Sequence, residues 1–126
     1  MGGGGSGYLA SATNATSHYH VHAYVGMHGT PVSKEAELFV PTLYTTGAKD
    51  DLVRPPVVKS SFEGSVSARP RVFAELSDAN HFEPTNPLKL RLNPYVAAFL
   101  LCHVTGDNAS CAKVYDATDA SSLCTA

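Results

Sequence analysis

Three short apolar segments, each followed by a turn, predict the strands of this chain. Each carries Val, Phe, Leu or Tyr and ends near glycine or small polar residues, a pattern typical of buried strands. The predicted strands cover residues 20–25, which end at Gly26, residues 39–44, which are followed by Gly47, and residues 72–76, which begin beside Arg71.

Helical segments separate or follow these strands. Residues 57–64 predict a short helix, and residues 88–101 predict a closing amphipathic helix in which Asn93-Pro94 marks a break. At the amino end, glycines at positions 2–5 precede a further stretch with helical spacing. The alternation of strands and helices favours an α/β fold with a mostly parallel sheet and flanking helices.

The composition bounds the class of protein. With 126 residues, of which 44% are hydrophobic and 16% charged, the chain resembles one globular domain. Its net charge of −2 and its pI near 6.3 argue against a nucleic acid or an anionic membrane as the partner. No stretch approaches the roughly 18 consecutive apolar residues that a membrane span needs.

Two kinds of catalytic side chain follow the predicted strands. Asp50 and its neighbour Asp51 come shortly after the strand at 39–44, and His81 follows the strand at 72–76. Ligands of open α/β sheets gather beyond the carboxyl ends of the strands, so we expect these groups at one edge of the sheet. A neutral imidazole can take a proton from a hydroxyl group and return it to a leaving alkoxide near neutral pH. The order therefore predicts an acid–base site formed by His81 and one of the two carboxylates.

Three motifs resemble those of one family, the α/β-hydrolases. Residues 1–6, MGGGGS, look like the segment that follows the serine of a G-x-S-x-G nucleophile elbow. Residues 41–55 end in the motif D-D-L-V-R-P, and residues 80–84, NHFEP, are similar to the family's histidine loop. In this order they resemble the cutinase and polyester hydrolase branch, with the neighbouring dienelactone hydrolase-like and lipase-like esterases. The resemblance covers most of residues 1–126 and implies one partial domain, the carboxyl-terminal half of an α/β-hydrolase fold.

The resemblance implies a Ser-His-Asp mechanism. The nucleophilic serine would stand immediately before Met1, and His81 would carry its proton. Asp50 would orient the imidazole, because alignment of the D-D-L-V-R-P motif favours Asp50 over Asp51. Met1 would donate its backbone N–H to the oxyanion hole.

The resemblance also implies a substrate class. The expected reaction is hydrolysis of a small-molecule or polymeric carboxylic ester, with no cofactor and no metal. His28 stands near a position where the family commonly has an aromatic residue that contacts the substrate, and Phe82 is a candidate apolar contact. Because the elbow serine is missing from these residues, we expect the chain to be inactive on its own.

Three cysteines lie near the carboxyl end. The resemblance implies a disulfide between Cys111 and Cys124 that closes a tail within residues 103–126, and such a loop stabilises by roughly 3 kcal/mol. Cys102 lies in an apolar run and is expected in the core, with pairing of Cys102 and Cys111, or free thiols, as alternatives. A tail disulfide implies a secreted or extracellular full-length protein, although Met1 is not followed by a secretory signal.

A second hypothesis is a noncatalytic fold fragment or binding module. His18, His20 and His22 alternate, so on a strand they would project from one face and could share a metal ion. No cysteine or carboxylate is interleaved with them, so we favour packing over metal binding. A partial sheet would also leave an unpaired edge, which predicts self-association.

Overall fold

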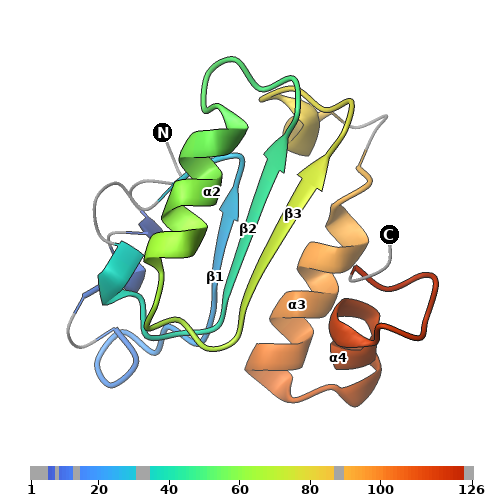
Figure 1. Ribbon diagram of the computed structural model, residues 1–126. Coiled ribbons are helices and arrows are strands. Elements are labelled where there is room, and N and C mark those ends of the chain that lie inside the picture. The colour runs from blue at the N-terminus through green and yellow to red at the C-terminus, as the bar shows by residue number, and fades with distance from the viewer. Residues whose placement is uncertain (1–5, 8, 13–14, 31–34, 87–89, 124–126) are drawn as a thin grey trace.

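A parallel sheet of three strands forms the centre of the computed structural model (Figure 1). The structure describes residues 6–7, 9–12, 15–30, 35–86 and 90–123. The strand order is β1 (Tyr24–Met27), β2 (Thr42–Gly47) and β3 (Arg71–Leu76), with Leu43 opposite Val25 on one side and opposite Val72 on the other. The chain is therefore an α/β structure, as the alternation of apolar segments predicts.

Helices cover both faces of the sheet. Helix α2 (Pro55–Gly64) packs on the face that presents Tyr44, and helices α3 (Asn93–Thr105) and α4 (Asn108–Tyr115) pack on the face that presents Leu43 (Figure 1). Successive side chains of a strand point to opposite faces, so both faces of β2 become buried, and every residue of this strand is buried. Two single-turn 3-10 helices, η1 (Glu35–Glu37) and η2 (Glu83–Thr85), complete the described elements.

The ends of the helices follow from local chemistry. Helices α2 and α3 each carry proline in the first turn, where its missing N–H removes no helical hydrogen bond. Helix α3 ends at Gly106, whose φ of 72° lies in the left-handed region that glycine adopts without strain. The side chain of Asp107 then caps α4 by accepting a hydrogen bond from the backbone N–H of Ser110 at 2.7 Å.

The predicted boundaries differ from the structure, and the starts of three elements were wrong by at least three residues. The first strand begins at Tyr24 rather than at residue 20, and the second covers 42–47 rather than 39–44. Within the predicted second strand, Val40 instead packs in the core ahead of the strand, and Pro41 separates the two. The closing helix begins at Asn93 rather than at residue 88, because Pro94 suits the first turn of a helix and not its interior.

The alternating histidines lie outside the sheet. His18, His20 and His22 precede β1 and are exposed, and His20 has a φ of 53° that is incompatible with a strand. The prediction that a strand aligns them on one face was therefore wrong. Within the described residues, no group of three His, Cys, Asp or Glu side chains is arranged to hold a metal ion. The described helices also include none with the length and apolar character needed to cross a membrane.

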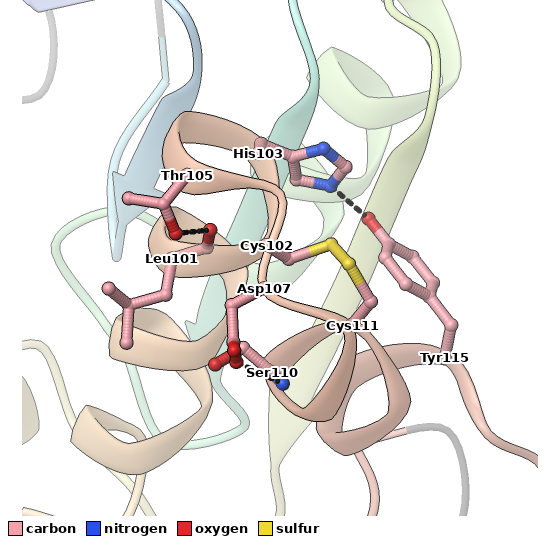
Figure 2. The surroundings of a disulfide bond; sticks show 8 residues. All are labelled: Leu101, Cys102, His103, Thr105, Asp107, Ser110, Cys111 and Tyr115. Carbon is pink, nitrogen blue, oxygen red and sulfur yellow. Dashed lines mark hydrogen bonds between the residues drawn. A yellow bond between two sulfur atoms is a disulfide. The ribbon is translucent and has the colours of Figure 1, made fainter.

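The disulfide joins Cys102 to Cys111, which corrects the predicted Cys111–Cys124 pairing (Figure 2). The turn at Gly106 folds α4 back against α3 and brings the two Cα atoms to 4.8 Å, within bridging distance. A hydrogen bond of 2.7 Å between His103 Nε2 and the Tyr115 hydroxyl links the same two helices, and burial lowers the pKa of His103. Cys124 lies outside the described residues.

We predict that Cys102→Ser lowers the free energy of unfolding by about 2–3 kcal/mol, because it removes a covalent constraint on the unfolded chain. Urea unfolding under oxidising conditions measures this, and Cys124→Ser is the matched control that should leave stability unchanged. A loss in Cys124→Ser with none in Cys102→Ser would contradict the observed pairing, which peptide mapping without reductant also reports.

Candidate functional site

The loops that follow β2 and β3 are joined to each other through their backbones. The N–H of Ala48 donates to the carbonyl of Leu76, and the N–H of Lys49 donates to the carbonyl of Ala79, both at 2.9 Å. The Gly47 backbone passes so close to Ala79 that an added Cβ would overlap the Ala79 carbonyl. Glycine is therefore required where the loops cross.

Asp50 is held rigidly in this junction. Its side chain is fully buried, and its Oδ1 accepts hydrogen bonds from the backbone N–H groups of Leu52 at 3.0 Å and Val53 at 2.8 Å. These two donors satisfy one carboxylate oxygen and fix the plane of the group. The other oxygen, Oδ2, faces the loop that follows β3.

His81, on the loop that follows β3, contacts Oδ2 of Asp50. Its Nδ1 lies 2.9 Å from Asp50 Oδ2, which is hydrogen-bonding distance between residues 31 positions apart. The imidazole is 28% exposed, and its ring meets the ring of Phe82 edge to face at 5.6 Å. Phe82 is exposed, and Asp51, the competing carboxylate, also points to solvent. The structure thus brings Asp50, His81 and Phe82 together and leaves Asp51 apart.

Ion pairs of Arg91 stabilise the loop that carries His81. Arg91 contacts Glu83 through Nε and Asp78 through Nη1, at 2.9 and 2.7 Å. The Asn80 side chain accepts a hydrogen bond from the backbone N–H of Phe82 at 3.0 Å, and this closes a local turn around His81. The loop conformation is therefore set by contacts on both sides of the histidine.

His28 lies next to Asp50 and His81. It directly follows β1, its side chain is 1% exposed, and its Nδ1 is 3.6 Å from Asp50 Oδ2. Its centroid lies 6.4 Å from that of the His81 ring. Desolvation lowers the pKa of His28, an effect that the negative charge of Asp50 partly opposes. Its expected contact with substrate stays a prediction.

The contact between His28 and Asp50 was not predicted from the sequence. The position of His28 directly after β1 could have indicated it. Strand β1 pairs with β2, which leads to Asp50, and the carboxyl ends of parallel strands share one edge of a sheet. Met1, the expected oxyanion-hole donor, lies outside the described residues. Cys111 lies in the α3–α4 disulfide.

The arrangement is suited to proton transfer. A carboxylate that accepts from Nδ1 fixes the tautomer of an imidazole, so that its Nε2 becomes the basic atom. Such a pair can remove a proton from a hydroxyl group and deliver it to a leaving group.

In comparisons with known proteins, neither a family model nor a curated protein sequence matches this chain.

We predict that Gly47→Ala destabilises the fold by about 1–3 kcal/mol, because the new methyl group would force the Ala79 backbone away from the Lys49 loop. Gly64→Ala is the matched control. A Cβ there would lie 3.5 Å from the Glu35 side chain, in ordinary contact, and alanine favours a helix over glycine. Urea unfolding of both variants checks this, and equal effects would contradict the importance of the crossing.

Proposed function

We propose that Asp50 and His81 are the acid–base part of a serine ester hydrolase, and that the serine stands immediately before Met1. The observation that carries this proposal is the 2.9 Å contact between His81 Nδ1 and Asp50 Oδ2 at the ends of adjacent parallel strands. Its support from the sequence is the order of the MGGGGS, D-D-L-V-R-P and NHFEP motifs, which is the Ser, Asp, His order of α/β-hydrolases.

In the proposed reaction the serine hydroxyl attacks the ester carbonyl while His81 Nε2 takes its proton. The tetrahedral intermediate then collapses, the alcohol leaves with the proton from His81, and an acyl-enzyme forms. Water repeats the sequence and releases the acid. Asp50 stays ionised throughout and stabilises the imidazolium. The exposed ring of Phe82 beside His81 supports an apolar group on the substrate.

The proposed fold is the carboxyl-terminal half of an α/β-hydrolase. Two structural features support a larger sheet. Among the described strands none pairs with β1 on the side away from β2. Helix α3 also leaves apolar side chains exposed, among them Leu101 and Val104, although long apolar side chains usually pack. A disulfide in the tail supports an oxidising, extracellular compartment for the full-length protein.

We predict that the chain joined to its upstream residues, which we expect to end in Gly-x-Ser, hydrolyses p-nitrophenyl butyrate. Asp50→Asn should lower kcat on the order of 10⁴-fold, because the imidazole loses the acceptor that sets its tautomer. Asp51→Asn, the adjacent exposed carboxylate, is the matched control and should keep full turnover.

The chain without upstream residues supplies the opposite arm of the same assay. Its hydrolysis should equal that of its His81→Ala variant, since no nucleophile reaches the imidazole. Turnover that depends on His81 in this chain alone would place a nucleophile within the 126 residues. An upstream sequence without Gly-x-Ser would instead favour a noncatalytic binding module.

A further inference from the structure

We propose that His28 is a second, reserve hydrogen-bond donor for Asp50, which takes the Oδ2 atom whenever His81 turns away. His28 would then be a positioning residue that keeps the carboxylate in place while the exposed imidazole exchanges protons. The inference rests on the proposed function for its consequence in turnover, although its geometry stands independently of any nucleophile.

The first observation concerns the hydrogen bonds of the buried His28 ring. Within the described residues, neither Nδ1 nor Nε2 of the buried His28 ring makes a hydrogen bond of normal geometry, although the Asn80 backbone lies near enough to raise the pKa of the ring. Burying an unpaired donor costs about 1–3 kcal/mol, so a polar ring in this position needs a compensating contact. The nearest anionic acceptor is Asp50 Oδ2 at 3.6 Å, the same oxygen that His81 contacts at 2.9 Å. A small approach of the ring would complete the bond, and a carboxylate oxygen can accept two donors.

The second observation is the contrast between the two imidazoles. His28 is fixed by its backbone, because its N–H donates to the Thr45 carbonyl at 2.9 Å, and its ring is 1% exposed. Its φ of 50° lies in the left-handed region, which costs an L-residue on the order of 1 kcal/mol. His81 instead lies on a loop with 28% of its side chain exposed. Asp50 therefore lies beside one enclosed imidazole and one that is partly exposed to solvent.

The charges around His28 agree with a neutral donor. Asp50, His81 and Glu83 are the titratable groups that act on it: the two carboxylates raise its pKa, and His81 lowers it. Desolvation is the largest effect and lowers the pKa overall, so His28 is neutral at neutral pH. A neutral ring with its proton on Nδ1 can donate to Oδ2 without placing a second positive charge beside the imidazolium of His81.

Imidazole NMR of the complete chain tests this inference without any need for turnover. In ¹H–¹⁵N spectra of histidine-labelled protein, His28 should be the neutral tautomer with its proton on Nδ1. In His81→Ala that proton should move downfield as the ring closes on Oδ2. The pKa of His28 should rise in the same variant, because a repelling group is lost and Asp50 is left to His28 alone. His81→Gln is a second variant for the same measurement should the alanine variant fail to fold.

Asp50→Asn and Asp51→Asn form the matched pair of controls. The first should lower the pKa of His28 further, because the carboxylate that raises it is lost, and the second should leave the His28 signals unchanged. A proton on Nε2, or His28 signals that are identical with and without His81, would overturn the proposal. Either result would leave the hydrolase proposal standing. Conversely, a protein without ester turnover would still show His28 signals that respond to the loss of His81. The two proposals can therefore fail separately.

Discussion

The backbone contact between the loops after β2 and β3 is the constraint on which the site depends. Parallel pairing brings the two carboxyl ends to one edge of the sheet, and the bond from the Lys49 N–H to the Ala79 carbonyl carries the pairing beyond the strands. Gly47 allows this because no side chain stands between the chains. Asp50 and His81 then lie a fixed number of residues past the crossing. The distance between the two residues therefore depends mainly on backbone geometry, and the contact between their side chains follows from it.

The layers around the sheet make that crossing rigid. Packing on both faces of β2 leaves the strand no exposed surface, so its end cannot move without disturbing α2 or the α3–α4 pair. The disulfide and the His103–Tyr115 bond hold α4 against α3 (Figure 2). The ion pairs of Arg91 hold the histidine loop. The local cost of burying a carboxylate is offset by its backbone donors, which the loop geometry provides.

Two imidazoles around one carboxylate give the site its chemical character. The ring of His81 is partly exposed, while the ring of His28 is enclosed. The proposed hydrolase mechanism uses the first property, and the proposed reserve donor uses the second. Both follow from the same sheet edge, because β1, β2 and β3 each deliver one of the three residues just beyond its carboxyl end.

The sequence by itself determined the α/β class, the strand predicted at 72–76 to within one residue of β3, and the placement of Asp50 and His81 after strands, because apolar periodicity and turn residues act locally. The resemblance of the D-D-L-V-R-P motif also favoured Asp50 over Asp51 as the expected partner of His81. Only the tertiary structure decided that Asp50 turns inward while Asp51 faces solvent, that Cys111 pairs with Cys102, and that His28 lies beneath the pair. Those outcomes depend on which segments meet in space: the α3–α4 turn sets the distance between the cysteines, and the lateral order of the strands sets which loop ends are neighbours.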